Sequence, residues 1–569
     1  MKDANFPKKP ASTEPDEIIE DLPCDAIDAE QPELQTDDTP DAVHDVTEQP
    51  AMLHAPDTPE VVPDGAPAAA EVDDKRAKPE IVCGPGLLNL CIKQAEQCLA
   101  ETGQHYAHGS NIVVVTNDAL TGEGVLRPLC RDTLPVELDG LADWYKETAR
   151  GMARAHPPRR VCSALLKAPQ FTHLLPLRGL AHQPFMRDDG EVCATEGYDP
   201  DTGLYASFGG LRFQVEDVNH ADAEDCLSVL EGLLDEFPFA TPHDRSAALC
   251  ALLTAALRSS LDSAPMFLVR AHQAGTGKSY LSRLITAFAT AKRPKPQQFP
   301  VSDEECGKVL VSALRLAPPV LEFDNVKGTL KDHESLCAAL TADQYQGREL
   351  GYSRMTAVST RTLMLASGNN VAIVSDLTRR CVPIDLDAGM DSPATRTFSN
   401  PGLVEEVLAN RALYVSLALM VVRGWIVAGC PRAAVPPLAS YSRWSDWCRQ
   451  PLLWLGRPDP VETVFKSMAD DPERATLRAF INEVEGQFGT NCFMVKEVIA
   501  RAMDTSKAGW EDLRDVLIEV TGDQGTINRK RLGHWVGQHH GRVVQGRKIV
   551  KAPVTRNAAV WQIEKVSSS

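Results

Sequence analysis

The chain of 569 residues lacks the long apolar runs that a membrane protein needs. Its longest candidate, Leu413–Val422, is interrupted by Ser416 and is followed directly by Arg423. This run is shorter than the ~18 residues that cross a bilayer. The N-terminus also lacks the charged and then apolar pattern of a secretory signal. We therefore expect no membrane association and no secretion.

Metal-binding cysteine patterns are missing as well. The fifteen cysteines form no Cys-x-x-Cys pair, and none pairs with a histidine at zinc-finger spacing. The closest set, Cys83, Cys91 and Cys98, has spacings of eight and seven residues, which suit one face of a helix. We expect core or surface thiols in a reducing cytoplasm rather than a metal centre.

Positive charge and aromatic residues are scarce in residues 1–80. This segment holds 22 acidic and 6 basic side chains and 12 of the 40 prolines. Such a composition cannot bury enough apolar surface to offset its ordering entropy. We expect a disordered acidic tail, either a solubilising extension or a partner-binding segment that mimics DNA. The rest of the chain has 52 basic and 56 acidic side chains, so the net charge of −20 does not exclude nucleic acid.

Beyond the tail, composition and periodicity predict four further regions. They are a mixed α/β N-terminal domain (81–235), an α/β domain with a mostly parallel sheet (236–435), a Trp-rich connector (436–474) and a small C-terminal domain (475–569). In the N-terminal domain, the patterns predict helices over Leu87–Thr102 and Gly140–His156 and a strand over Ile112–Thr116.

The strongest local motif follows an apolar strand predicted over Met266–Ala271. Residues 272–279 read His-Gln-Ala-Gly-Thr-Gly-Lys-Ser, which matches the phosphate loop G-x-x-x-x-G-K-[ST] except that His272 replaces the first glycine. A helix is predicted directly afterwards, over Tyr280–Ala291. Strand, glycine-rich turn and helix are the context in which backbone N–H groups and a helix N-terminus bind phosphate.

This motif assigns roles to individual residues. Lys278 is expected to reach the β- and γ-phosphates of ATP, and the Ser279 hydroxyl to ligate Mg²⁺. The expected nucleotide contacts are Gln273, Ala274, Gly275, Thr276, Gly277, Lys278, Ser279 and Tyr280.

A second apolar strand, Pro319–Phe323, ends in Asp324, 46 residues after Lys278. Its carboxylate is expected to hold Mg²⁺ directly or through water. Many ATPases place a glutamate after this aspartate to orient the attacking water, but here Asn325 follows. Glu322 shares the strand face of Asp324 but lies one step back, toward the sheet interior. Hydrolysis is therefore expected to be slow or to use another base.

Two polar groups follow, Asn369 45 residues after Asp324 and Arg380 further along the chain. A strand over Thr362–Ala366 leads to Asn369, which suits a sensor of the γ-phosphate, although an Asn-rich turn is the simpler interpretation. Arg380 comes eleven residues later, and an arginine can stabilise a transferring phosphoryl group across a subunit interface. Lys278, Asp324, Asn369 and Arg380 follow one another in this order and at these spacings. The order and the spacing strengthen all four as catalytic candidates.

This ordered set resembles the core of a superfamily 3 helicase, a branch of the AAA+ ATPases. The stretch Phe323–Thr329 is similar to the Walker B stretch of polyomavirus large T antigen helicases. The strand end Ser367–Asn370 and the pair Arg379-Arg380 resemble those of phage, plasmid and integrative-element primase-helicases, as do Gly197–Tyr205 and Trp454–Pro460. The resemblance covers roughly residues 170–569 and is most specific over 266–386.

The resemblance implies a ring, usually a homo-hexamer, with ATP between subunits. It implies that Asn369 is sensor 1 and that Arg380 is an arginine finger. It also implies a DNA-gripping hairpin between the Walker B and sensor 1 strands. Arg348 and Arg354 of this interval are either phosphate contacts in the ring channel or solvated surface residues. His272 and Asn325 depart from the family pattern and put the catalytic rate in doubt more than nucleotide binding.

The sequence pattern of residues 475–569 predicts a winged-helix-like DNA-binding domain. Three helical patterns precede a recognition helix over Asn528–His540, then a hairpin over Gly541–Val550 and a final strand over Ala559–Ile563. Residues 526–569 hold nine Lys/Arg and one acidic residue. Arg529, Lys530 and Arg531 begin the helix, and Arg547 and Lys548 stand on the wing, which suits duplex DNA. Protein docking is the alternative.

Together these patterns predict a replicative, ATP-dependent DNA helicase of a bacterial mobile element, active in the cytoplasm, with an AAA+-type P-loop core. Two alternatives remain. One is a non-unwinding AAA+ ATPase such as an initiator or loader, and the other is a DNA-binding regulator with a nucleotide switch. Residues 81–235 show neither clustered strand carboxylates nor a zinc ribbon, so the sequence gives no ground for a primase activity.

Overall fold

A computed structural model describes residues 78–348, 355–506, 508–521, 526–552 and 559–566. The predicted acidic tail, apart from residues 78–80, and Arg354 of the predicted hairpin lie outside these residues. The described chain is a mixed α/β protein built around a four-stranded parallel sheet.

The sheet has the order β13-β16-β12-β17, and every neighbouring pair is parallel. Its strands are β12 (Met266–Ala271), β13 (Val320–Leu330), β16 (Leu363–Ile373) and β17 (Cys381–Leu386). The strands are apolar almost throughout because both faces are covered. The predicted strands are confirmed, but β13 and β16 continue well beyond Asp324 and Asn369, where the sequence pattern had placed their ends.

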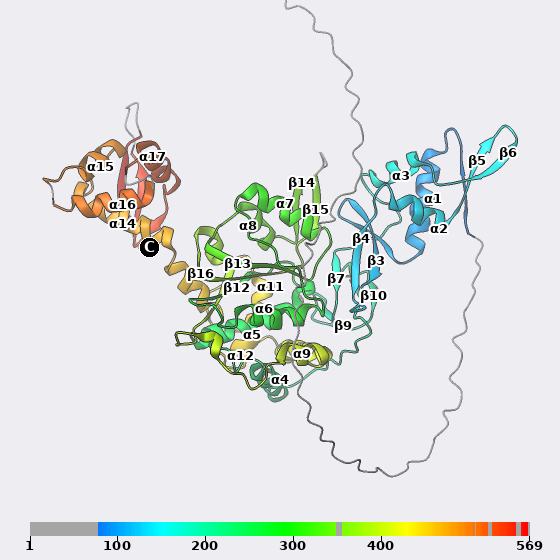
Figure 1. Cartoon of the computed structure of the whole chain (residues 1–569), viewed down its shortest axis with the longest axis horizontal. Coiled ribbons are helices and arrows are strands. Elements are labelled where there is room, and N and C mark those ends of the chain that lie inside the picture. The colour runs from blue at the N-terminus through cyan, green and yellow to red at the C-terminus, as the bar shows by residue number, and fades with distance from the viewer. Residues whose placement is uncertain (1–77, 349–354, 507, 522–525, 553–558, 567–569) are drawn as a thin grey trace, which may run out of the picture. The chain divides into compact units, whose positions relative to one another are not determined.

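Successive side chains of β12 alternate between two cores. Phe267 and Val269 pack into the cluster that contains α5 (Pro242–Leu257) and α6 (Lys278–Ala289). Met266 and Leu268 pack into the cluster that contains α7 (Asp303–Leu314) and α8 (Glu334–Thr341). These two helix pairs cover opposite faces of the sheet (Figure 1). This layering fixes the carboxyl ends of the strands, and therefore the loops that follow them, along one edge.

The N-terminal region contains several small sheets with the orders β1-β5-β6, β2-β3-β4, β10-β11-β7 and β8-β9. Its elements are β1 (Glu80–Cys83), α1 (Leu88–Glu101), β2 (His105–His108), β3 (Asn111–Asn117), β4 (Gly124–Pro128), α2 (Thr133–Leu141), β5 (Asp143–Thr148), β6 (Gly151–Ala155), α3 (Arg159–Leu166), β7 (Gly179–Ala181), β8 (Phe185–Met186), β9 (Val192–Cys193), β10 (Gly197–Asp199) and β11 (Leu204–Ala206).

The prediction of a helix over Gly140–His156 is wrong. Strands β5 and β6 occupy this stretch and form an antiparallel hairpin. Trp144 of β5 pairs with Ile81 of β1 and is buried, and Gly151 turns the chain with a φ of 107°. Aromatic residues and a left-handed glycine favour the hairpin over a helix. The predicted helix Leu87–Thr102 and strand Ile112–Thr116 are confirmed.

One helix that precedes the sheet in the chain and several that follow it pack into the same core as α5. They are α4 (His220–Gly232), α9 (Leu403–Ala409), α10 (Arg411–Val427), α11 (Ser442–Trp444), α12 (Gln450–Trp454) and α13 (Glu462–Ala469). Trp444 and Leu452 of the predicted connector belong to this core. Among the described residues, no single helix is long and apolar enough to span a membrane. The pair α9 and α10 passes that test together, with an 84° bend, and most of α10 is buried in the core.

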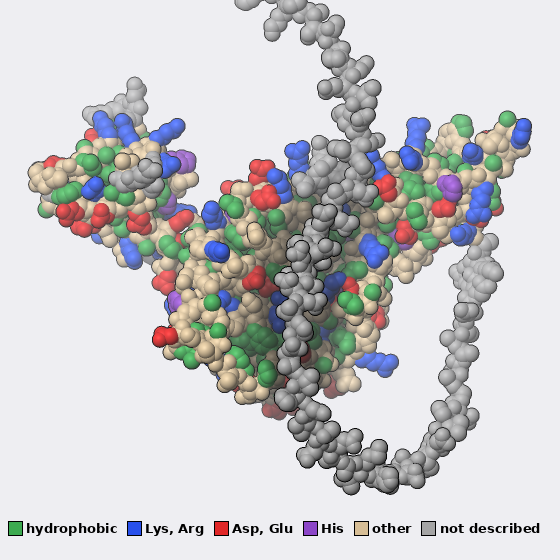
Figure 2. All heavy atoms as spheres, in the orientation of Figure 1, with side chains coloured by type: hydrophobic (Ala, Val, Ile, Leu, Met, Phe, Trp, Pro, Cys, Tyr) green, Lys and Arg blue, Asp and Glu red, His purple; other side chains and the backbone are tan. Residues whose placement is uncertain are grey.

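In its described residues, the C-terminal module holds four helices and a three-stranded antiparallel sheet with the order β18-β19-β20. Its elements are α14 (Pro472–Phe488), α15 (Val495–Ala502), α16 (Trp510–Thr521), α17 (Arg529–Gln538), β18 (Val543–Val544), β19 (Arg547–Lys551) and β20 (Trp561–Lys565). The helices and the hairpin that were predicted here are present. Figure 2 shows Lys and Arg side chains gathered on one side of this module and Asp and Glu side chains on another.

Candidate nucleotide-binding site

The loop between β12 and α6 is shaped by two left-handed glycines. Gly275 has a φ of 79° and Gly277 a φ of 102°. A Cβ atom at Gly275 would lie 2.7 Å from the Cβ atom of Ala394, so a side chain does not fit there. Gly277 is the N-cap of α6 and has no side chain to cover the first N–H groups of the helix. These groups and the helix dipole make a phosphate-binding position.

Lys278 is folded back onto this loop. Its Nζ atom donates to the carbonyl oxygen of Gln273 at 3.0 Å, and the Thr276 hydroxyl donates to the same carbonyl at 2.7 Å. Burial lowers the pKa of Lys278, while the nearby carboxylate of Asp324 acts in the opposite direction. A bound polyphosphate would offset this burial and favour the charged lysine. The loop residues around Lys278 include three exposed ones, Gln273, Ala274 and Ser279.

Asp324 lies at an irregularity in β13. The register with β16 shifts between Phe323 and Val326, and Asn325 takes a left-handed φ of 56°. The Asp324 Oδ1 atom accepts from the Asn325 N–H at 2.8 Å and from the Ser367 hydroxyl of β16. These bonds orient the carboxylate and leave Oδ2 without a partner among the described residues.

Magnesium suits this donor set. The Ser279 hydroxyl and the second oxygen of Asp324 are hard oxygen ligands, which Mg²⁺ prefers. The described residues contain no group of three or more His, Cys, Asp or Glu side chains that could hold a metal. An ion here would therefore take its other ligands from nucleotide phosphates and water, as is usual for Mg²⁺.

Glu322 is buried beside the site and 5% exposed. Burial, followed by the nearby charge of Asp324, raises its pKa. The prediction that Glu322 faces the sheet interior agrees with this position. Glu322 lies within β13 and is buried, so it does not occupy the position of the acid that is absent at 325.

Asn369 stands at the same sheet edge. It pairs in register with Ala271, the last residue of β12, and is exposed. The neighbouring Asn370 has a φ of 50°, and its Oδ1 atom lies 3.0 Å from Nδ1 of His272. His272, at the start of the loop, therefore links that loop to β16, a contact that sequence spacing did not predict.

Arg380 lies away from the phosphate loop of its own chain. It precedes β17, and its carbonyl accepts from the N–H of Met266 at the amino end of β12. Its guanidinium lies 2.7 Å from the Asp376 carboxylate and also donates to the Cys337 carbonyl and the Thr341 hydroxyl. The side chain is 12% exposed. A role at a neighbouring subunit's ATP stays a prediction.

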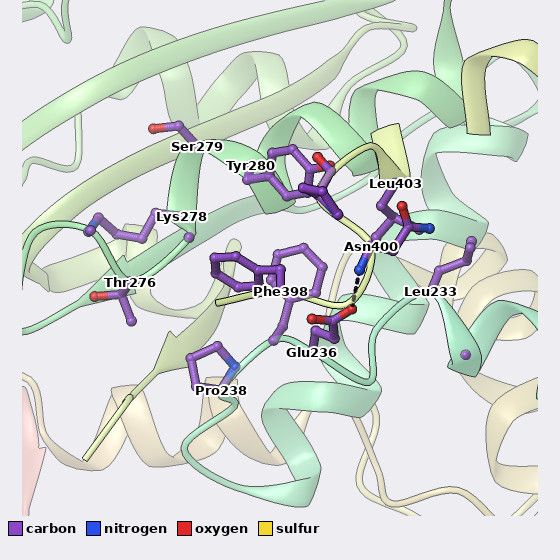
Figure 3. A pocket seen from close by; sticks show the side chains of 15 residues that line it. Leu233, Glu236, Pro238, Thr276, Lys278, Ser279, Tyr280, Phe398, Asn400 and Leu403 are labelled. Atoms are coloured by element: carbon purple, nitrogen blue, oxygen red, sulfur yellow. Dashed lines mark hydrogen bonds between the residues drawn. The ribbon is translucent and has the colours of Figure 1, made fainter. Parts of the chain in front are cut away.

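A cavity of about 520 Å³ opens beside the phosphate loop. It is lined by Gly232, Leu233, Glu236, Phe237, Pro238, Gly275, Thr276, Gly277, Lys278, Ser279, Tyr280, Phe398, Asn400, Pro401 and Leu403. Figure 3 shows Tyr280 and Phe398 beside Lys278 in this cavity. Of the predicted nucleotide contacts, Gly275 to Tyr280 line it, whereas Gln273 and Ala274 do not.

Glu236 joins the two segments that wall the cavity, because it accepts hydrogen bonds from residues 396–400. The Glu236 carboxylate accepts from the backbone N–H groups of Ser399 and Asn400 at 2.8 and 2.9 Å, and Figure 3 draws the second bond. The backbone carbonyl of Glu236 also accepts from Arg396 at 2.8 Å, and the Arg396 guanidinium lies over the ring of Phe398.

Sequence spacing did not find these wall residues. They come from segments about 40 residues before and 120 residues after the phosphate loop, and no motif links them to it. One signal was available in the sequence, an aromatic residue, Phe398, in a loop of polar residues. Apolar side chains that cluster at a surface often mark a binding site.

No protein-family model and no curated protein matches the sequence. Solved structures show limited likeness. The C-terminal region of NrS-1, in an apo A form, is 11% identical with a TM-score of 0.30, and the match covers 79% of this chain and 96% of that chain. The JCV helicase, with a small molecule bound, is 14% identical with a TM-score of 0.19, covering 42% of this chain and 68% of that chain. Function must therefore be argued from the site.

Proposed function

We propose that the chain is an ATP-dependent DNA helicase that hydrolyses ATP at the subunit interfaces of a ring. One observation carries this proposal. A phosphate loop with two left-handed glycines follows β12, and the carboxylate of Asp324 and the amide of Asn369 lie within the parallel strands β13 and β16, near the level at which β12 ends. This arrangement offers a phosphate cradle, a Mg²⁺ ligand and a polar group near the γ-phosphate.

The ring and its DNA rest on sequence resemblance together with two features of the chain. β14 (Gln344–Arg348) and β15 (Met355–Ser359) form an antiparallel hairpin between β13 and β16, as expected for an element that contacts DNA in a ring channel. The C-terminal module carries exposed Arg529 and Lys530 at the start of α17, which supports binding of duplex DNA.

The direct test is strand displacement on a forked duplex with ATP and Mg²⁺. We expect unwinding by the parent chain and ATP turnover that rises when single-stranded DNA is added. Lys278→Ala should bind no ATP and displace no strand, because the positive charge facing the phosphates is removed. Lys167→Ala, an exposed lysine of the N-terminal region, is the matched control and should behave like the parent. Equal ATP affinity in Lys278→Ala and the parent would contradict the proposal.

A second function is favoured by the residue after Asp324. Asn325 cannot act as a base, and Glu322 is buried with a raised pKa, so slow hydrolysis is expected. A slow ATPase suits an initiator or loader that holds DNA without unwinding it. Turnover stimulated by single strands, with no displacement of a forked strand over many turnovers, would favour this second function.

A further inference from the structure

We propose that the start of α14, with the carboxylates of Asp471 and Glu473, positions Arg380 for ATP hydrolysis. This inference deepens the proposed function, because it rests on Arg380 acting on ATP in a neighbouring subunit. It concerns contacts that lie outside the nucleotide site and belong to no motif of the sequence.

Arg380 directly follows a short 3-10 helix, η2 (Ser375–Arg379), which comes after β16. The Asp376 carboxylate of this helix binds two guanidinium groups, because Arg379 Nε donates to it at 2.5 Å and Arg380 Nε at 2.9 Å. The placement of Asp376 therefore decides where the Arg380 guanidinium lies. Since Asp376 follows Ser375 in the chain, a change in the backbone at Ser375 is passed on to it.

Ser375 is held by two carboxylates from the start of α14. Its N–H donates to Oδ2 of Asp471 at 3.3 Å, and its hydroxyl donates to the Glu473 carboxylate. Asp471 is also the N-cap of α14, because its Oδ1 accepts from the N–H of Glu473 at 3.0 Å. A single carboxylate that is 8% exposed thus caps the helix and holds η2, which ties the position of η2 to that of α14.

The backbone of Ser375 has a conformation that depends on these contacts. Its φ is 53°, in the left-handed region that a residue with a Cβ atom rarely adopts. Such a conformation persists where the surrounding contacts over-determine it, and the two bonds from α14 supply contacts of this kind. Without them, Ser375 would relax toward an ordinary φ, and Asp376 would move with it.

Other contacts hold the far end of this segment. Arg380 Nη1 donates to the Cys337 carbonyl and to the Thr341 hydroxyl, both at 2.9 Å. Loss of the α14 contacts should therefore displace the guanidinium without unfolding the segment. A displacement of about 1 Å can cost roughly 100-fold in rate, which is less than the loss of about 10³-fold expected when an arginine finger is removed.

α14 is also the first helix of the C-terminal module. Leu477, Phe480 and Val484 of this helix pack in the core of the module. The contacts with Ser375 therefore join the module to the segment that carries Arg380, so the module contributes to ATP hydrolysis as well as to DNA binding.

The test compares Glu473→Ala, Glu473→Gln and Ser375→Ala in the full chain, with Asp470→Ala at an exposed neighbour as the matched control. Hydrogen exchange of the backbone amides of residues 375–380 reports on positioning and requires no ATP turnover. We expect exchange about tenfold faster in Glu473→Ala and Ser375→Ala, because each removes a hydrogen bond to a charged group. Glu473→Gln keeps an acceptor for the Ser375 hydroxyl, and Asp470→Ala leaves the contact intact, so both should match the parent.

ATP turnover measures the consequence of this positioning. Glu473→Ala and Ser375→Ala should lower kcat by roughly 10- to 100-fold and leave the Kd for ATP unchanged. The double variant should lose no more than either single variant, because both remove the same bond. Glu473→Gln should keep the kcat of the parent, since the bond and not the charge is what positions Arg380.

Three results would overturn the inference. The first is unchanged amide exchange or unchanged kcat in Glu473→Ala. The second is a loss in Glu473→Gln equal to that in Glu473→Ala. The third is a weaker Kd for ATP together with a lower melting temperature, which would make the contact merely structural. A parent chain without ATP turnover would contradict the proposed function instead, and the exchange of residues 375–380 would still decide whether α14 positions Arg380.

Discussion

The phosphate loop and the C-terminal module both present positive charge, but they hold it differently. Lys278 lies against a backbone carbonyl of its own loop. On the wing, Arg547 is 2.6 Å from the Glu485 carboxylate and Lys548 is 3.4 Å from that of Glu564. A backbone-built anion site can be found from residue spacing, whereas a surplus of basic residues does not reveal which of them are already paired.

Pairing with glutamates reduces the positive charge that the wing of the C-terminal module presents. Glu485 comes from α14, more than 60 residues before Arg547 in the chain. The local surplus of positive charge in residues 526–569 therefore overstates what the wing offers to DNA. Arg529 and Lys530 at the start of α17 are exposed, so the recognition helix is the stronger candidate for phosphate contact.

The largest effect is expected at Arg380, if it stabilises ATP hydrolysis in a neighbouring subunit. Arg380→Ala should retain ATP binding and lose turnover by about 10³-fold or more, the magnitude of an arginine finger. Mixing it with Lys278→Ala should restore part of the activity, since one mixed interface holds both intact groups. Arg379→Ala is the control, because Arg379 also contacts Asp376.

The structure supplies a competing role for Arg380. Its contacts with Asp376, Cys337 and Thr341 anchor β17 to α8. If this anchoring is its main role, Arg380→Ala will lower the melting temperature, and mixed rings, once confirmed to form, will show no recovered activity.

The next effect concerns the geometry of the phosphate loop. Gly275→Ala should weaken nucleotide binding at least tenfold, because the new Cβ meets Ala394 at 2.7 Å and the left-handed backbone disfavours a side chain. Gly389→Ala is the matched control. Gly389 has a φ of 60° but no atom within 4 Å of its Cβ position, so it reports backbone strain alone. Equal losses in nucleotide affinity for both variants would show that the close approach to Ala394 is unimportant.

A smaller effect is expected on the salt dependence of DNA binding, and it differs between α17 and the wing of the C-terminal module. Removing Arg529 and Lys530 together should reduce the slope of log K against log salt for duplex DNA by about two units, roughly one for each phosphate contact. Removing Arg547 and Lys548 should change it by less than about one unit, because both are paired with glutamates. A larger change from the wing pair than from the helix pair would reverse this ranking, and full-chain binding at several salt concentrations measures both.

The smallest effect is on stability and concerns mainly the N-terminal region. His105, His108 and His182 are buried there, as is His539 in the C-terminal module, and burial lowers the pKa of all four below the usual 6.5. Between the lowered pKa and 6.5, the unfolded chain binds more protons than the folded chain. The free energy of unfolding should therefore fall as the pH drops below about 6.5, by at most about 1.4 kcal/mol per pH unit for each histidine.

Urea unfolding monitored between pH 5 and pH 8 measures this dependence. His108→Gln removes one titrating group and keeps a donor for the Leu177 carbonyl, which the ring contacts at 2.9 Å. It should flatten the pH dependence, while His156→Gln, at a side chain that is 92% exposed, should not. An unchanged slope in His108→Gln would assign the acid sensitivity to other groups.

The sequence predicted the parts of the site that depend on local backbone geometry. The strand–glycine turn–helix at 266–289 and the positions of Asp324 and Asn369 at one sheet edge follow from short patterns. The sequence did not predict the cavity walls, the pairing of Arg547 with Glu485 or the pairing of β5 with β1. These depend on contacts between distant segments, and hydrophobic periodicity carries no information about which segments meet.

The left-handed conformation at position 325 limits how the proposed ATPase could be re-engineered. The obvious design for a faster enzyme places an acid directly after Asp324, and glutamate is the usual choice. At a φ of 56°, however, a long side chain costs roughly 1–2 kcal/mol of backbone strain, whereas asparagine and aspartate are the side chains that tolerate this region best. The accessible acid at this position is therefore aspartate, whose carboxylate reaches one methylene less far, so a gain in speed would require β13 to be reshaped as well.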